Sequence, residues 1–480
     1  IKLAAPLLKS AETLRKTTVD VAIYGNDMID FNVHHGSDIW VNGDLEKIKG
    51  SAKYQLKSID LALSKPFRPN TGKPGFRLYG TLPALSVDDW LEWYDVEIGQ
   101  ADTSNKVDSS GSDWDFIQSL DLKLQSADII GREFTDVDFF LTQEVTEFLV
   151  DIKSSLLIGQ FTIPKKQSSE DPIIADLEYL KFQSLESSDP SPDSTLLPDD
   201  FYNLNIFSKI ATYNDHTVDN LKIETRVDNN NLVIQKFGFQ RDKVFLNGKG
   251  VWQYDSTNKK NITHLNFGLK GSEFGQAMVN LNLGDAIGNG EIELNSYLTW
   301  PNSLLNFDWE NLTGNASFFL KEGVLKNVEP GTGRLIGLLS LNALPRRLLF
   351  GFSDVVREGL EFDMISGSYI IDGEKLITND TKMDSTSATV LVTGTTGIKS
   401  EIYDQKMFIT PKIGQTLPLL GGVIAGGPVG WGLFLFEKLF KKTIDKVVEI
   451  EYTINGTWDD PEIVLIKNTK VQPEIINNAE

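Results

Sequence analysis

Residue types that carry catalysis or bind metals are scarce in this chain. It contains no cysteine and four histidines, at His34, His35, His216 and His264. No two of the histidines have the spacing of a metal-binding motif such as H-E-x-x-H. His34 and His35 are adjacent on an expected strand, where neighbouring side chains point to opposite faces of the sheet. We therefore predict no metal site and no cofactor.

Nucleophile and phosphate-binding motifs are incomplete as well. Gly351–Val355 (GFSDV) lacks the second glycine of a G-x-S-x-G elbow. Gly331–Gly337 is rich in glycine, but no Lys-Ser/Thr follows it and no alternation of strands and helices surrounds it. Asp459 and Asp460 precede Pro461, a combination that predicts a turn. The sequence predicts that the protein is not an enzyme. A β-solenoid enzyme acting on envelope polysaccharide is an alternative, and it requires clustered carboxylates with raised pKa values in a polar cleft.

Charge and composition limit the class of partner. The chain has 480 residues, a formal net charge of -21 and 40% hydrophobic residues. The acidity argues against binding nucleic acid through bulk charge. The hydrophobic content excludes an intrinsically disordered chain. The length allows two to four ordinary domains or one elongated domain.

Alternation of apolar and polar residues dominates the sequence and predicts strands with one apolar face and one solvated face. The clearest case is Glu449–Asn455, which places three apolar residues on one side. Glycines are often followed within a few residues by an aromatic, as in Gly250…Trp252 and Gly314…Phe318. The apolar positions of the clearest strands either pack an ordinary core or line an apolar groove: Leu120, Leu122, Leu124, Leu221, Ile223, Leu265, Phe267, Leu269, Ile292, Leu294, Ile450, Tyr452 and Ile454.

The expected fold is mainly β. Many short strands with few helices predict stacked barrels, a β-solenoid or one long, curved sheet, and the pattern leaves these three open. Near the N-terminus, Gly50–Leu56 and Ser58–Leu63 are expected as two separate strands, and Ser86 as the N-cap of a short helix. The other helices expected are Leu3–Arg15, Thr332–Ala343 and Ser353–Glu358.

Three regions are expected along the chain. Residues 1–183 form a β-groove segment, residues 184–200 a linker or loop rich in Ser, Pro and Asp, and residues 201–480 a second β-groove region. The second region includes a helical tip at residues 413–448.

The tip contains an apolar stretch, Ile413–Lys442, unlike anything else in the chain. No charged residue occurs from Ile413 to Phe436, but Pro418 and Pro428 interrupt the helix that would be needed to span a membrane. We predict a helical hairpin that either contacts a membrane or plugs the end of the groove. The candidates for membrane contact are Leu417, Leu419, Leu420, Val423, Ile424, Trp431, Leu433, Phe434, Leu435, Phe436, Lys438, Phe440, Lys441 and Lys442.

An ordered series of short motifs resembles a known family. They are Trp300-Pro301, Leu312-Thr313-Gly314, Gly323, Glu329–Leu341, Leu344–Leu348, Phe352–Val355, Phe362-Asp363, Ile365-Ser366-Gly367, Tyr403-Asp404-Gln405, Pro418-Leu419, Gly426-Gly427-Pro428 and Gly456–Pro461. The series is similar to the C-terminal region of YhdP-type proteins, members of the AsmA-like family of Gram-negative bacteria. Gly80–Leu85 followed by Trp90-Leu91 resembles a segment of the same proteins.

The resemblance implies that the chain is a fragment of a longer protein, anchored in the inner membrane by an N-terminal helix outside this sequence. Such proteins cross the periplasm as a taco-like β-sheet groove and help to carry phospholipid to the outer membrane. The resemblance therefore implies one long, curved and twisted antiparallel sheet that forms a taco-like hydrophobic groove, with the apolar strand positions named above as candidates for lining its lipid path. The expected partners are therefore phospholipids, the inner membrane and, at the C-terminal tip, the inner leaflet of the outer membrane. The family offers no catalytic residues to transfer. An assembly factor for the outer membrane without a lipid path is a further alternative.

Overall fold

The computed structural model describes residues 16–64, 74–86, 89, 116–129, 132–165, 171–182, 197–326, 360–386, 388–412, 448–458 and 460–470. The chain divides into two compact units. Unit 1 comprises residues 1–188 and 202–214, and unit 2 comprises residues 189–201 and 215–480. The expected linker at 184–200 lies near this division, and the expected domain boundaries themselves stay a prediction.

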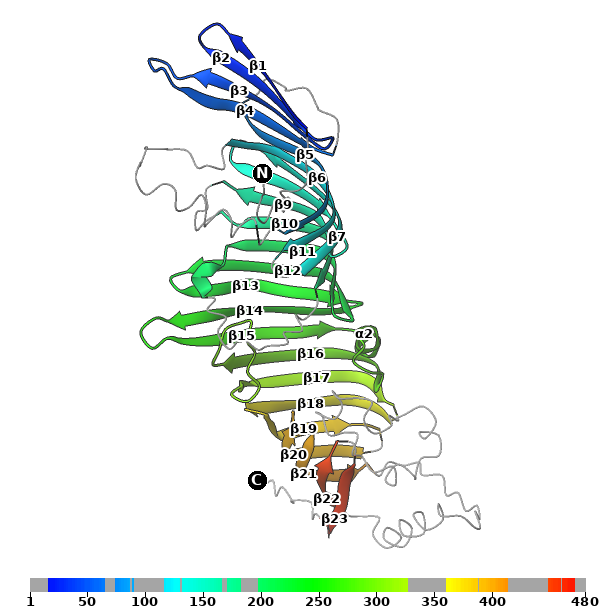
Figure 1. The fold of residues 1–480 in the computed structure, drawn as a ribbon. Coiled ribbons are helices and arrows are strands. Elements are labelled where there is room, and N and C mark those ends of the chain that lie inside the picture. The colour runs from blue at the N-terminus through cyan, green and yellow to red at the C-terminus, as the bar shows by residue number, and fades with distance from the viewer. Residues whose placement is uncertain are drawn as a thin grey trace, which may run out of the picture. The chain divides into compact units, whose positions relative to one another are not determined.

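Unit 1 is built from strands (Figure 1). They are β1 (Thr17–Tyr24), β2 (Met28–His35), β3 (Ile39–Lys47), β4 (Tyr54–Leu63), β5 (Gly75–Ser86), β6 (Ile117–Ile129), β7 (Arg132–Gln143), β8 (Glu147–Lys153), β9 (Leu157–Pro164), β10 (Ile173–Phe182) and β11 (Leu204–Tyr213).

Each strand of unit 1 pairs with the strand that precedes it in sequence. Most of these pairs are antiparallel, but β4–β5, β5–β6 and β10–β11 are parallel. The predicted antiparallel order is therefore interrupted at three positions. A parallel partner needs a return connection, and at these positions the chain between the strands is longer than a hairpin turn.

Unit 2 contains β12 (His216–Asp228), β13 (Asn231–Arg241), β14 (Val244–Asp255), β15 (Lys260–Gly271), β16 (Ile287–Trp300), β17 (Thr313–Leu325), β18 (Leu360–Asp372), β19 (Lys375–Asp384), β20 (Ala388–Gly397), β21 (Ile402–Pro411), β22 (Val448–Thr457) and β23 (Pro461–Lys470). From β12 to β23, each strand pairs antiparallel with the next strand of the unit.

Two short helical segments belong to unit 2. The 3-10 helix η3 (Pro198–Asp200) contacts β12, β13 and β14, and the helix α2 (Phe274–Asn280) packs on β16. The sequence analysis did not predict α2. A Cβ atom at Gly275 would lie 2.3 Å from the carbonyl oxygen of Ile287, so the glycine allows the helix to lie directly against the strand. Among the described residues no helix is long and apolar enough to cross a membrane.

One expected strand boundary near the N-terminus is wrong. The structure has a single strand, β4, in place of separate strands at Gly50–Leu56 and Ser58–Leu63. Gly50 adopts φ +77° in the turn between β3 and β4, and a bulge on the β3–β4 ladder keeps the later residues in one strand. The Ser86 Oγ accepts a hydrogen bond from the Asp89 amide at 3.2 Å, as an N-cap would, but most of the helix expected after it lies outside the described residues.

The expected fold class is confirmed: the described chain is mainly β, and its strands form curved, open sheet with few helices. The expected helices at Leu3–Arg15, Thr332–Ala343 and Ser353–Glu358 lie outside the described residues, as does the hairpin Ile413–Lys442 with all of its membrane-contact candidates.

Candidate functional site

The apolar face of unit 1 is continuous across all of its strands. Residues that lie directly opposite each other on successive strands form one cross-strand row in which every member is apolar. Most of these side chains are half-buried. From β1 to β11 the row is Val19, Val33, Val41, Leu61, Leu78, Leu120, Leu141, Val150, Phe161, Ala175 and Ile206.

The opposite face of unit 1 carries the charges. On β4 and β5, the Arg77 Nε donates to Asp60 Oδ1 at 2.6 Å, and the Asp60 side chain is only 4% exposed. On β3 the Asp44 Oδ2 accepts a hydrogen bond from the Ser58 hydroxyl at 2.6 Å. Asp30 lies directly opposite Asp44, and burial together with the charge of Asp44 raises the pKa of Asp30. The two faces of this sheet therefore differ sharply in polarity.

Unit 2 repeats the arrangement. One row across β12–β18 runs through Ile223, Phe237, Gly248, Phe267, Ser296, Ala316 and Tyr369. A second row, across β16–β22, is wholly apolar and consists of Ile292, Leu320, Ile365, Met383, Val390, Ile409 and Ile450. Both rows lie on the same face, which we call the apolar face of unit 2.

Phenylalanine rings lie over glycines at three places on the apolar faces. Phe31 is opposite Gly43, and a Cβ atom on this glycine would come 2.3 Å from the ring. Phe237 has the same relation to Gly248, at 2.3 Å, and Phe362 to Gly323, at 2.4 Å. Each ring covers the backbone of the neighbouring strand where a side chain is missing. The apolar faces therefore stay covered by side-chain atoms at these three glycines.

The structure places the candidate groove residues on these faces, with two degrees of exposure. Tyr452 and seven aliphatic or aromatic residues are half-buried: Leu120, Leu221, Ile223, Leu265, Phe267, Leu269 and Leu294. The others are buried within packed clusters: Leu122, Leu124, Ile292, Ile450 and Ile454. The half-buried residues can contact a ligand in the structure as it stands, whereas the buried ones form core. That any of them contacts lipid stays a prediction.

The exposure of the apolar face changes along unit 2. On β12 and β15, Ile223, Leu265 and Phe267 are half-buried. On β18 and β20, by contrast, Ile365 and Val392 are 0% exposed. The accessible apolar surface of unit 2 therefore lies on its first strands.

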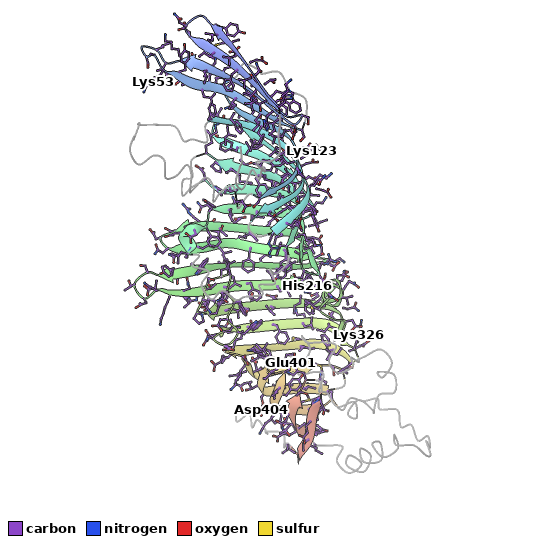
Figure 2. All side chains as sticks on the ribbon, in the orientation of Figure 1. Lys53, Lys123, His216, Lys326, Glu401 and Asp404 are labelled. Carbon is purple, nitrogen blue, oxygen red and sulfur yellow. The ribbon has the colours of Figure 1, made fainter. Side chains whose placement is uncertain are left out.

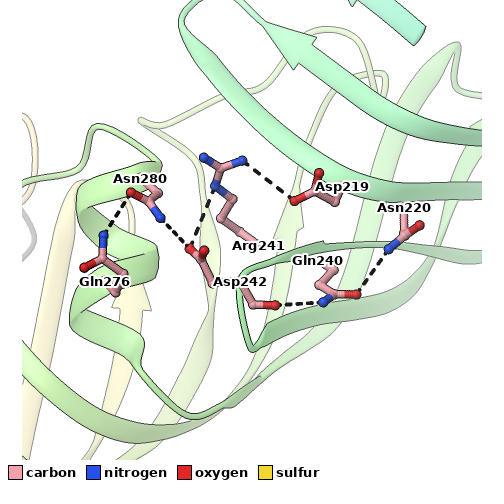
Figure 3. Close-up of polar contacts among 7 residues, drawn as sticks. All are labelled: Asp219, Asn220, Gln240, Arg241, Asp242, Gln276 and Asn280. Carbon is pink, nitrogen blue, oxygen red and sulfur yellow. Dashed lines mark hydrogen bonds and ion pairs between the residues drawn. The ribbon is translucent and has the colours of Figure 1, made fainter. Parts of the chain in front are cut away.

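Helix α2 and its polar contacts border the apolar face at one set of strand ends (Figure 3). The Asn280 side chain donates to Asp242 Oδ2 at 2.9 Å, and Gln276 donates to Asn280 at 3.0 Å. Arg241, at the end of β13, lies 3.7 Å from Asp219 and 3.9 Å from Asp242. These contacts tie α2 to the ends of β12 and β13 and hold it at this border.

Two hollows of the described surface are lined largely by charged side chains of the face opposite the apolar one. In unit 1 a hollow across β6–β10 is lined by Asp121, Lys123, Asp138, Asp151 and Asp176, among others. Lys123, labelled in Figure 2, donates to Asp138 at 2.7 Å, and this bond raises the pKa of Lys123. Gln160 donates to Asp151 at 2.6 Å.

These contacts give the enzyme alternative little support. Two of the carboxylates in the hollow are bonded to neighbouring side chains, and the aspartate with a raised pKa, Asp30, is not part of it. Within the described ranges no group of three or more His, Asp or Glu residues is arranged to hold a metal ion. His34 stacks on Trp40 at 5.1 Å, while the His35 Nδ1 lies 2.7 Å from the Thr17 hydroxyl.

Comparison with known proteins decides the family. The model of the YhdP protein family matches residues 1–463. The chain belongs to the YhdP protein family. The resemblance predicted from the motifs is therefore confirmed. Over 227 residues, 47% of this chain, the sequence is 27% identical to the intermembrane phospholipid transporter YhdP of Escherichia coli (strain K12). The matched part is 18% of that relative's length, and no solved structure matches.

Sequence reasoning overlooked part of the apolar face of this YhdP family member. Phe31, Val33 and Val41 belong to the face of unit 1, but they lie on short strands, and the candidates come only from longer ones. It also overlooked the loop that follows Trp300, where leucine and aromatic side chains alternate with polar ones. A search for short strands with apolar residues only at every second position would have found the first group.

Proposed function

We propose that this chain is a segment of a bridge-like carrier that moves phospholipids across the periplasm, from the inner to the outer membrane, along the apolar faces of its sheets. The observation that carries the proposal is the unbroken apolar row across β1–β11, most of which is half-buried. The proposal is also supported by the relative in Escherichia coli, which is named an intermembrane phospholipid transporter.

The physical argument is the cost of moving a lipid through water. Each methylene group taken out of an apolar environment costs about 0.8 kcal/mol, so a two-chain phospholipid faces a barrier on the order of tens of kcal/mol. An apolar surface that continues from strand to strand lowers this cost at every step. A cross-strand row advances by about 4.8 Å per strand, so an acyl chain can shift by one strand without leaving apolar contact.

The charged face has a complementary role. Ion pairs such as Lys270–Glu293 and Lys406–Glu451 lie on the face opposite the apolar rows of unit 2, and their lysine side chains are largely exposed. They keep that face hydrated and discourage stacking of two sheets. A carrier needs this asymmetry, because its lipid path must be apolar while the protein stays soluble.

The anchoring in the inner membrane and the contact with the outer membrane at residues 413–448 belong to the same proposal. They rest on the family resemblance and on the apolar, uncharged stretch Ile413–Phe436. Inserting a charge at Leu435 or Phe436 should weaken binding to anionic vesicles while leaving the β-content unchanged. Loss of the fold in such a variant would contradict membrane contact.

The test of the lipid path is a direct one. We would purify the chain, extract bound lipid and identify it by mass spectrometry. A photocrosslinking amino acid at Ile223 or Phe267 should label phospholipid. The matched control is the same probe at Phe319, which is 48% exposed on the opposite face of β17. Absence of phospholipid from the extract, or equal labelling from the probe at Phe319, would refute the proposal.

A further inference from the structure

Tryptophans mark one border of the apolar face of unit 2. Trp252 on β14, Thr263 on β15 and Trp300 on β16 are directly opposite each other, and all three are at most 2% exposed. Each tryptophan is covered by a phenylalanine in an edge-on contact: Phe201 on Trp252 at 5.5 Å, and Phe307 on Trp300 at 4.9 Å. The residues that cover this border therefore come from segments outside the sheet.

One of these segments is the loop between β16 and β17, residues 301–312, which we call the rim loop. Its Asn302 carbonyl accepts a hydrogen bond from the Thr263 hydroxyl at 2.8 Å. Leu304 and Leu312 belong to a cluster with Trp300 that also contacts Leu265 and Leu298 of the apolar face. The rim loop thus bends toward the apolar face, and Figure 1 shows the chain between β16 and β17 passing over the neighbouring strands.

The rim loop is braced by one aspartate. Asp308 Oδ1 accepts the amides of Glu310 and Asn311 at 3.0 and 3.1 Å, and its Oδ2 accepts the side-chain amides of Asn311 and Asn302 at 3.0 and 3.2 Å. The hydrogen bonds, first among them that from the Asn311 side chain, lower the pKa of Asp308. Lys399 Nζ also pairs with Glu310 at 3.1 Å. The loop is held in place without help from a ligand.

Three large apolar side chains of this braced loop remain exposed. Leu305 is 63% exposed, Trp309 51% and Phe307 38%, and Trp309 packs edge-on against Phe307 at 4.7 Å. A loop that is fixed by several hydrogen bonds but leaves three such groups in water has an apolar partner missing. The chain Trp309–Phe307–Trp300 connects these groups directly to the buried border of the apolar face.

Charge distinguishes between the partners that could cover this patch. Residues 301–312 include Asp308 and Glu310 and no lysine or arginine. A loop that inserts into an anionic membrane surface is expected to carry basic residues, so the acidic groups disfavour that partner. Continuity with Leu265 and Leu298 instead favours an apolar ligand that already lies on the sheet.

We propose that the rim loop holds an acyl chain of a phospholipid against the apolar face through Leu305, Phe307 and Trp309. This proposal rests on the proposed function, and it adds the element that keeps the lipid from leaving sideways. The acyl chain lies against the exposed side chains of the rim loop and continues onto the half-buried parts of Leu265 and Leu298, which the cluster with Leu304 and Leu312 covers only in part. Helix α2 borders the opposite ends of β15 and β16, so the apolar face of these strands is bounded on both sides.

Photocrosslinking tests the contact directly. The probe is placed at Leu305, at Trp309, at Phe267 as the positive control and at Phe319 as the control on the charged face. The purified chain is exposed to vesicles of phosphatidylethanolamine and phosphatidylglycerol, separated from them and then irradiated. We expect labelling of phospholipid from Leu305, Trp309 and Phe267, and at least tenfold less from Phe319.

The outcomes separate the two proposals. Labelling from Phe267 with none from Leu305 and Trp309 would overturn the rim-loop proposal and leave the carrier proposal standing. No labelling from Phe267 would overturn the carrier proposal itself. A second sample is irradiated before the vesicles are removed. Labelling from Leu305 and Trp309 in that sample alone would show that the patch meets a membrane surface, which also overturns the rim-loop proposal.

A paired substitution gives an independent readout. The double variant Leu305→Ser with Trp309→Ser removes exposed groups, so the unfolding midpoint should stay unchanged. Loss of two apolar contacts should lower the lipid retained after purification by roughly tenfold. Phe319 is 48% exposed but lies on the charged face, so Phe319→Ser should retain as much lipid as the unaltered chain. Equal retention in the double variant and the unaltered chain would contradict the proposal.

Discussion

The rings that lie over glycines allow one substitution to be compared at two sites. The atoms nearest to a Cβ atom at Gly43 would be those of the Phe31 ring, at 2.3 Å, and the atoms nearest to a Cβ atom at Gly323 would be those of the Phe362 ring, at 2.4 Å. Neither glycine has a positive φ, so alanine causes no backbone strain. The clash is the same, but the surroundings differ: Phe31 is half-buried, whereas Phe362 is 3% exposed within the largest core cluster.

The free energies of unfolding should therefore change in opposite directions. Alanine in place of glycine restricts the unfolded chain and stabilises by about 0.4–1 kcal/mol when the native backbone accepts it. At Gly43 the Phe31 ring can rotate toward the open face, so Gly43→Ala should be stabilising by about 0.5 kcal/mol or neutral. At Gly323 the Phe362 ring has no free volume, and overpacking costs about 1–3 kcal/mol. Gly323→Ala should therefore destabilise by roughly 1–2 kcal/mol.

Urea unfolding followed by tryptophan fluorescence measures both changes. The double variant Gly323→Ala with Phe362→Leu should recover most of the loss relative to Phe362→Leu alone, because the smaller side chain leaves room for the added methyl group. A similar loss at both glycines, or no recovery in the double variant, would refute the idea that ring mobility decides the cost.

Other predictions concern ionisable groups. Arg77→Met should destabilise unit 1 by about 3–5 kcal/mol, because it leaves the Asp60 carboxylate buried without its cation. In the same urea assay, the double variant that adds Asp60→Asn should recover most of the lost stability. Burial raises the pKa of Tyr369 to about 12, so the free energy of unfolding should fall by up to about 2.7 kcal/mol as pH rises from 10 to 12. Unfolding measurements across this pH range should show that Tyr369→Phe abolishes the loss. The pKa of Asp30 is raised in the folded protein, chiefly by burial, so Asp30 stabilises the fold below its unfolded-state pKa, and this stabilisation is lost as pH rises through its folded-state pKa. Asp30→Asn should therefore gain more stability at pH 7 than at pH 4. An equal gain at the two pH values would contradict the shift.

The strands were predictable because their signal is local. Glu449–Asn455 alternates over seven residues, and the structure places it within β22. Helix α2 was not predictable, because seven residues that include Gly275 carry too little periodicity and the helix depends on contact with Ile287. The parallel pairs depend on where a distant strand docks, which no local pattern records.

The site was predictable only as a list of apolar positions. Glycine and aromatic residues recur close together in the sequence, as in Gly250…Trp252, but the contacts that matter join different strands, as between Phe237 and Gly248. Such contacts depend on strand register, which the sequence alone leaves open. Register also decides that Trp252, Thr263 and Trp300 form one border, although the residues are far apart in the chain.

The pairing of each strand with its sequence neighbours has a consequence for how the protein forms. In both units, almost every contact within the sheet joins segments that are a single turn or connection apart. Contact order is therefore low for a protein made of strands, and the entropy lost in closing each new loop is small. Each strand can dock on the edge of the strand before it as soon as that earlier strand has formed. Growth in this way exposes only one unpaired edge at a time, which limits aggregation before the chain is complete.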